Sequence, residues 1–202
     1  MKTLLIPSLI VFSMFALQTN AQTCVLTCPP NIIVKADSAK GNARVSYNPL
    51  ENSADCGSVT YTPASGSLFK IGSTSVIGTN SKGDRCSFTV LVTDNEAPSI
   101  SPLTFSVHKV WPANGKMKEV AVAYTSKDNA DSCVCTLAVT SNDAEGKRSW
   151  EIVNSHLVKL AAARLPDGTP RVYTITATCT DEAGNSARRS KTIAVAKNVA
   201  KR

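Results

Sequence analysis

The acidic side chains in the middle of the chain are the first whose spacing points to chemistry. The stretch VTDNEAPSI (92–100) sets Asp94, Asn95 and Glu96 just ahead of a proline. Ca²⁺ prefers such oxygen ligands and takes about six to eight of them. Since this segment supplies too few, a calcium site there needs more from other acidic positions, which are Asp84, Asp128, Asp131, Asp181 and Glu182. The alternative is a hinge between two domains, and the sequence favours the hinge.

The cysteines are the second candidates for chemistry. The segments CVLTC (24–28) and CVC (133–135) lack the Cys-x2-Cys pairs or neighbouring histidines of a tetrahedral zinc site. Disulfides are therefore expected, provided that the chain is exported to an oxidising compartment. Seven is an odd number, so one cysteine should remain as a free thiol or bridge to a partner. The seven are Cys24, Cys28, Cys56, Cys86, Cys133, Cys135 and Cys179.

Catalytic motifs are absent from the sequence. It contains no Gly-x-Ser-x-Gly elbow, no His-Glu-x-x-His and no P-loop. His156 follows Ser155 directly, and two neighbours on one short segment do not build a catalytic triad. We therefore expect no enzyme. Trp111 and Trp150 are candidate ligand contacts, although Trp111 fits a half-buried rim position better than a binding platform.

The N-terminus has the pattern of a signal peptide. Lys2 precedes the apolar run TLLIPSLIVFSMFALQ, and small residues stand before a break after Ala21. The run is shorter than the ~20 residues of a membrane helix, and no second such run follows. A secreted, extracellular protein is expected, without membrane insertion once residues 1–21 are removed.

Positive charge is concentrated in the second half of the chain. Residues 22–96 carry six Lys and Arg against six Asp and Glu, whereas residues 97–202 carry fifteen against nine. Such asymmetry can mark an acidic partner, of which acidic polysaccharide is the best specific class. Nucleic acid is not expected, because few aromatic residues accompany the basic ones. The simpler interpretation, solubility, is favoured.

Alternation with a period of two predicts an all-β protein. It runs through ARVSY (43–47), CSFTVLV (86–92), EVAVAY (119–124) and RVYTITATC (171–179). Helical periodicity is scarce, and the segment 155–165 is expected to be an edge strand or a short turn. Segments 73–94 and 171–196 form a weak repeat of strand, Gly-containing turn and strand, which predicts two domains that meet at about residues 95–98.

The first half resembles the hyalin repeat, or HYR, domain. The resemblance rests on four ordered blocks, which are CPPNIIV (28–34), ADCGSV (54–59), PASGSLFKIGSTSV (63–76) and CSFTVLVTDNEAP (86–98). The turn NSKGD (80–84) departs from the D-x-x-G-N of that family. The second half looks like an immunoglobulin-like module often found beside HYR domains. The linker is also similar to the DND-x-AP linkers of cadherins.

This resemblance implies two tandem immunoglobulin-like β-sandwich domains and a role in adhesion or matrix contact. The domains are expected at 22–96 (HYR) and 97–197 (immunoglobulin-like), followed by a basic tail at 198–202. The partner would be an extracellular protein or polysaccharide. Two alternatives remain open, which are a carbohydrate-binding module for acidic polysaccharide and a small secreted inhibitor or effector.

Disulfide pairing follows from the expected strand positions. Cys28 on the first strand can reach Cys86 on the last, which leaves Cys24 for Cys56. Four cysteines allow three pairings, so this is a preference among them. In the second domain Cys135 and Cys179 are expected to bridge the two sheets. Cys133 is left unpaired and is available for a disulfide-linked partner.

Peptide mapping of the unreduced protein tests this assignment. We expect peptides that link Cys28 to Cys86 and Cys24 to Cys56, because strand neighbours bring the first pair within the ~7 Å that a bridge needs. A peptide that links Cys24 to Cys28 would contradict it.

Overall fold

The computed structural model describes residues 24–48, 56–129, 132–143 and 149–197. The expected signal peptide, the basic tail and Asp131 lie outside these ranges. The helices and strands of the described residues are all β-strands, with no α-helix among them, so the all-β prediction is confirmed. The described part of the chain contains no helix with the length and apolar character of a membrane span.

Residues before the linker form one sandwich. Its larger sheet has the order β1-β6-β5-β3, with β1 parallel to β6 and the other pairs antiparallel. These strands are β1 (Ile32–Lys35), β6 (Arg85–Thr93), β5 (Gly72–Asn80) and β3 (Val59–Thr62). A smaller sheet consists of β2 (Asn42–Val45) and β4 (Ser67–Lys70).

Residues after the linker form a second sandwich. One sheet has the order β11-β14-β15, from β11 (Cys133–Ser141), β14 (Val172–Asp181) and β15 (Ser186–Ala194). The other has the order β12-β13-β9-β8, from β12 (Trp150–Asn154), β13 (Leu157–Ala161), β9 (Met117–Ala123) and β8 (Thr104–Phe105). A short ladder pairs β7 (Ser99–Ile100) with β10 (Ser126–Lys127).

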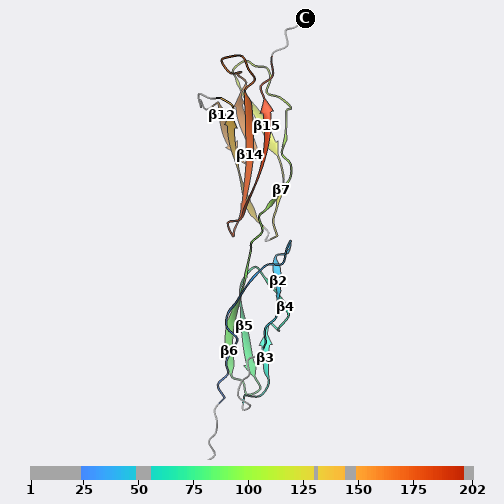
Figure 1. Cartoon of the computed structure of the whole chain (residues 1–202), viewed down its shortest axis with the longest axis vertical. Coiled ribbons are helices and arrows are strands. Elements are labelled where there is room, and N and C mark those ends of the chain that lie inside the picture. The colour runs from blue at the N-terminus through green and yellow to red at the C-terminus, as the bar shows by residue number, and fades with distance from the viewer. Residues whose placement is uncertain (1–23, 49–55, 130–131, 144–148, 198–202) are drawn as a thin grey trace, which may run out of the picture.

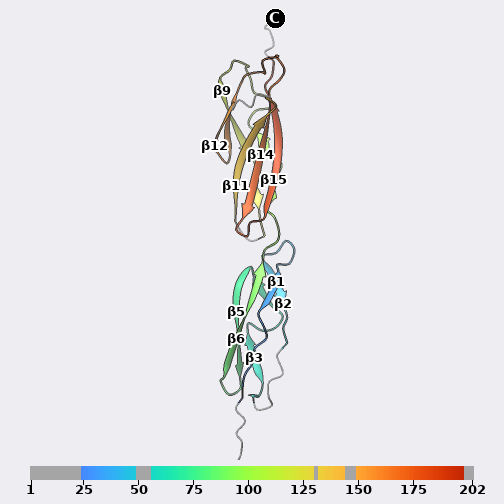
Figure 2. The ribbon, with the colours of Figure 1, turned by 60° about the vertical axis from the view of Figure 1, so that its left-hand side comes forward.

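Each sandwich encloses its own apolar core. Phe88, Val90 and Val92 of β6 are buried in the first core. Tyr173 and Ile175 of β14 are fully buried in the second, while the threonines between the buried residues of β14 point the other way. The alternation predicted from the sequence is therefore confirmed, because a period of two places every second side chain on one face. Figures 1 and 2 show the two bodies stacked end to end along the long axis.

Two expectations about strand placement were wrong. The segment 155–165 contains β13, which lies between β12 and β9 and is an interior strand, not an edge strand. Val158 and Leu160 are fully buried, which is why the segment belongs inside the sheet. The Cys135–Cys179 disulfide joins two residues directly opposite each other on β11 and β14, so it lies within one sheet and does not bridge two.

A buried ion pair closes the end of the second sandwich that is remote from the linker. Arg171 is 8% exposed, and its Nη1 lies 3.0 Å from Asp143 Oδ2. The guanidinium also donates to Ser149 Oγ at 2.6 Å and to the Ala163 carbonyl at 3.2 Å. Together these contacts satisfy a charge that would otherwise be costly to bury.

Replacing Arg171 with methionine tests this arrangement. Arg171→Met removes the buried ion pair with Asp143, so we expect the free energy of unfolding to fall by about 3–5 kcal/mol. Lys159→Met is the matched control, because Lys159 pairs with Glu151 at 3.8 Å on the surface. The control should change stability by less than about 1 kcal/mol in urea denaturation. Equal effects of the two changes would contradict the prediction.

Candidate metal site at the junction of the two sandwiches

The linker between the sandwiches is five residues long. It runs from Asp94, directly after β6, to Pro98, directly before β7, and Pro98 is buried. The β7–β10 ladder then places Ser99 opposite Lys127. The loop that follows β10 is thereby fixed beside the linker.

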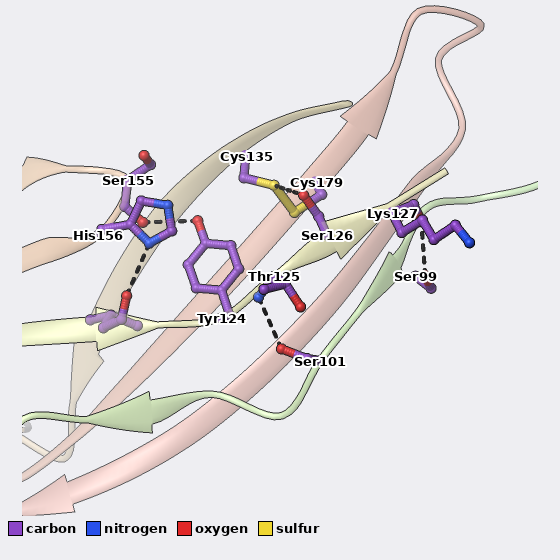
Figure 3. Close-up of a disulfide and its surroundings, with 11 residues drawn as sticks. Ser99, Ser101, Tyr124, Thr125, Ser126, Lys127, Cys135, Ser155, His156 and Cys179 are labelled. Atoms are coloured by element: carbon purple, nitrogen blue, oxygen red, sulfur yellow. Dashed lines mark hydrogen bonds between the residues drawn. A yellow bond between two sulfur atoms is a disulfide. The ribbon is translucent and has the colours of Figure 1, made fainter. Parts of the chain in front are cut away.

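Figure 3 shows the side-chain hydrogen bonds around this ladder. The Ser99 hydroxyl donates to the Lys127 carbonyl at 2.9 Å, and the Thr125 amide donates to Ser101 Oγ at 2.9 Å. Ser126 Oγ lies 3.4 Å from Cys135 Sγ of the disulfide. The position of the loop after β10 is therefore set by the second sandwich, to which β10 is attached.

Three carboxylates converge at the junction. Asp94 comes from the linker, Asp128 from the loop after β10 and Asp181 from the end of β14. One oxygen atom of each lies within 4.8 Å of the others. Two carboxylate charges this close repel each other by roughly 3 to 4 kcal/mol at an effective dielectric constant of about 20. A divalent cation between them would replace that repulsion with attraction.

Asp94 and Asp181 are held by local hydrogen bonds. Asp94 Oδ1 accepts from the Glu96 amide at 3.1 Å, while its Oδ2 is buried and has no hydrogen-bond partner among the described residues. Asp181 is 8% exposed, and it accepts from the Asn185 amide at 2.8 Å and from Asn185 Nδ2 at 2.9 Å. No lysine or arginine within the described ranges forms an ion pair with either carboxylate.

The turn that carries Asp181 recurs in the first sandwich with its polar residues exchanged. In the second sandwich Asp181 accepts from Asn185, whereas in the first Asn80 Nδ2 donates to Asp84 Oδ2 at 2.9 Å. A glycine with φ of 91° precedes the last residue of each turn, at Gly184 and at Gly83. The departure from D-x-x-G-N in NSKGD therefore keeps the side-chain hydrogen bond between the two ends of the turn.

Asp84 lies far from the junction. It precedes β6, whereas Asp94 follows it, and nine strand residues at about 3.3 Å each separate the two by roughly 30 Å. Of the further ligands considered from sequence, the structure thus brings Asp128 and Asp181 to Asp94. Glu182 lines the neighbouring recess but accepts a hydrogen bond from Ser132 Oγ at 3.0 Å.

Glu96 spans the junction by hydrogen bonds. Its carboxylate accepts from Ser38 Oγ and from the Ala39 amide, both at 2.8 Å, in the turn between β1 and β2. Asn129 Nδ2, from the second sandwich, donates to the same Glu96 Oε2 at 3.0 Å. Asn95 is exposed and accepts from Thr93 Oγ1 at 3.2 Å. Of the three linker residues proposed as calcium ligands from sequence, only Asp94 belongs to the carboxylate cluster.

A recess of about 430 Å³ adjoins the cluster. Asp94, Asn129 and Glu182 line it, together with Gly41 and Lys70. A Cβ on Gly41 would lie 2.7 Å from the Asn129 carbonyl oxygen, so glycine permits the close approach of the two sandwiches. No ion pair within the described ranges joins Lys70 to the carboxylates.

The tryptophans lie at the other end of the second sandwich. Trp150 is half-buried, with its ring edge-on to Tyr173 at 6.4 Å. Trp111 is 53% exposed and follows Val110, which pairs with Val195 after the end of β15. Since β14 runs ten residues from Val172 to Asp181, both tryptophans are remote from the carboxylates.

Six of the seven cysteines form disulfides, and the seventh is a free thiol. The structure contains the disulfides Cys24–Cys56, Cys28–Cys86 and Cys135–Cys179, and Cys133 is a free thiol. Cys133 is half-buried and stands opposite Asp181 on β14.

Burial raises the pKa of Tyr124, and the nearby Cys133 raises it further. Tyr124 stacks on His156 at 4.6 Å and donates to the Ser155 carbonyl (Figure 3), which accounts for His156 as a packing residue.

Comparisons with known proteins show no family for this chain. No protein-family model matches the chain, and no curated protein matches it. Solved structures with a similar arrangement include the extracellular cadherin domains 1–4 of protocadherin gamma B7 (12% identity, 82% of this chain, 47% of that chain, TM-score 0.37). Another is Drosophila N-cadherin EC1-3 (18% identity, 86% of this chain, 66% of that chain, TM-score 0.35). A third is the Sidekick-1 immunoglobulin domains 1–4 (10% identity, 88% of this chain, 48% of that chain, TM-score 0.43).

The chain spans 47% of the protocadherin chain and 66% of the N-cadherin chain. At identities of 18% or less and TM-scores below 0.5, these likenesses say nothing about what this chain binds. The three disulfides are typical of proteins that fold in an oxidising compartment.

Crowding at Gly41 tests whether the two sandwiches are docked. Gly41→Val should push the β1–β2 turn away from Asn129, because the first added carbon already meets the Asn129 carbonyl oxygen. We expect a broader range of inter-sandwich angles by small-angle X-ray scattering, with the stability of each sandwich changed by less than about 1 kcal/mol. Lys40→Val, at the exposed neighbouring position, is the control. Identical scattering from both variants would contradict a docked junction.

Proposed function

We propose that this chain is a non-catalytic extracellular adhesion or matrix-interaction module, in which Ca²⁺ stiffens the junction between two immunoglobulin-like sandwiches. One observation carries the proposal, which is the convergence of Asp94, Asp128 and Asp181 within 4.8 Å across that junction. The hinge favoured from sequence would then be flexible only in the absence of the ion.

The donor set fits a hard cation. All three donors are carboxylate oxygens, which suit Ca²⁺, Mg²⁺ or Mn²⁺ better than zinc or copper. The donors come from a linker and two loops, and Ca²⁺ tolerates such irregular geometry, whereas Mg²⁺ demands a near-ideal octahedron. The buried Asp94 Oδ2, which has no hydrogen-bond partner among the described residues, is the atom that most needs a cation.

The bound ion would act as a cross-link. It would supply attraction between the linker and two loops of the second sandwich, which now repel one another. Asp94 leaves the first sandwich directly from β6, so a fixed Asp94 would also fix the direction of that strand. The result would be a stiff two-sandwich rod suited to presenting or spacing a binding surface.

Membership of the hyalin-repeat type is the finer part of the proposal. Several features of the first sandwich support it. Phe69, in the block PASGSLFKIGSTSV, is 2% exposed and belongs to the first core. The turn at Asn80–Asp84 keeps its hydrogen bond despite the altered residues, and the second sandwich carries D-x-x-G-N itself at Asp181–Asn185.

The partner class is an extracellular protein or an acidic polysaccharide. Trp111 is the residue that favours the carbohydrate-binding alternative, because it is exposed, whereas Trp150 packs on the core. Cys133 offers a route to a disulfide-linked partner, and the inhibitor alternative rests on size and disulfides. The carboxylate cluster supports the spacing or adhesive role over these.

Thermal unfolding with and without calcium tests the proposal. Ca²⁺ at a hundredfold excess over its Kd should stabilise the protein by about 2.7 kcal/mol, seen as a rise of several degrees in Tm. Asp94→Asn and Asp181→Asn should abolish this rise. In chelator Asp94→Asn should have a higher Tm than the parent, since it removes carboxylate repulsion and keeps an oxygen for the Glu96 amide.

Asp84→Asn is the matched control, because Asp84 occupies the equivalent turn at the distant end of β6. It should leave the calcium response unchanged. A parent protein whose Tm does not respond to calcium, or a response that survives Asp94→Asn, would leave the junction as a plain linker.

A further inference from the structure

We propose that Asn129 is a further ligand of this cation through its side-chain carbonyl oxygen, and that Glu96 is the positioning residue that aims it. This inference rests on the proposed calcium function. It assigns to Glu96 a role different from that of a ligand, and it adds a residue that carries no charge.

The orientation of the Asn129 amide is fixed by its partner. Glu96 Oε2 is a carboxylate oxygen and can only accept, so the group 3.0 Å from it must be the NH₂ of Asn129. The Oδ1 of Asn129 therefore points elsewhere. That atom is buried and has no hydrogen-bond partner among the described residues.

A buried carbonyl oxygen without a partner is costly. Such an atom loses its hydrogen bonds to water and gains none in return, which is why it is rare unless a ligand or ion completes it. Asn129 follows Asp128 directly in the loop after β10, and it lines the same recess as Asp94. Amide carbonyl oxygens are ordinary Ca²⁺ ligands, so this oxygen suits the ion that the carboxylates would hold.

Both carboxylate oxygens of Glu96 accept hydrogen bonds from protein donors. It receives the Ser38 hydroxyl and the Ala39 amide from the first sandwich and the Asn129 amide from the second. Ala39 has a φ of 56°, a conformation that few residues other than glycine adopt, and its amide points at Glu96. Glu96 thus transmits the position of the first sandwich to a ligand on the second, in the way that outer hydrogen bonds orient metal ligands.

Calcium titration calorimetry on the full chain tests whether Asn129 binds the ion or only supports the structure of the loop. We expect Asn129→Ala to weaken CaCl₂ binding about tenfold. Asn95→Ala, which removes an exposed amide from the linker, should change it less than about twofold. Asn129→Asp loses the hydrogen bond to Glu96 just as alanine does, but it keeps an oxygen that can bind the ion, so its calcium affinity should be clearly higher than that of Asn129→Ala.

The positioning role of Glu96 is tested by a double-mutant cycle. Glu96→Ala should weaken calcium binding three- to tenfold in the parent and by less than twofold in the Asn129→Ala background, because it acts through Asn129. Equal effects in the two backgrounds would overturn the positioning role.

The outcomes distinguish a failure of the Asn129 inference from a failure of the proposed calcium function. If the parent binds calcium and Asn129→Ala binds it as tightly as Asn95→Ala, Asn129 is not a ligand and the calcium proposal stands. If Asn129→Asp is as weak as Asn129→Ala, the role of Asn129 is structural and the inference is overturned. If the parent binds no calcium, both proposals fall.

Discussion

The approach of three carboxylates to within 4.8 Å of one another is the constraint around which the junction of the two sandwiches is built. Asp94, Asp128 and Asp181 are brought together by elements whose own stability lies elsewhere, in two separate apolar cores. Each core buries enough aliphatic and aromatic surface to hold its loops in place. The unfavourable contact at the junction is therefore imposed by the fold, and an external cation is the simplest means of offsetting it.

Several weaker contacts hold the same junction in register. The β7–β10 ladder ties the loop of Asp128 to the strand that follows the linker, and Glu96 ties that loop to the first sandwich. Asn185 adds a long contact of 3.5 Å to the Asp94 carbonyl. These neutral and charge-assisted hydrogen bonds can hold the loops close when no ion is bound, although each contributes only about 0.5–3 kcal/mol.

The sequence predicted the strands well and the site in part. Period-two alternation placed Tyr173 and Ile175 inside because a strand offers only two faces. It could not show that β13 is an interior strand, since Lys159 beside Val158 and Leu160 imitates the alternation of an edge strand. The bridge expected between sheets lies within one, because the face of a cysteine does not reveal which strand is its neighbour.

At the site, Asp128 and Asp181 were named among several acidic positions, but their convergence depends on contacts between residues more than 30 apart in the chain. Glu96 was named as a possible ligand because its carboxylate stands beside Asp94, and in the fold that carboxylate accepts three hydrogen bonds. Asn129 was missed altogether. A single amide in a loop carries no signal in the sequence, and its significance comes from the orientation that Glu96 imposes.

The Cys28–Cys86 disulfide decides how tension would pass through the first sandwich. Cys28 precedes β1, and Cys86 is the second residue of β6, the strand that leads directly into Asp94. A pull applied between the segment before Cys28 and the linker therefore crosses the sulfur–sulfur bond and continues along β6. Everything between these two cysteines, including the hydrogen bonds of the other strands, lies outside that path. With this disulfide formed, the first sandwich should not lengthen under such a pull. Any extension would begin in the second sandwich or at the junction.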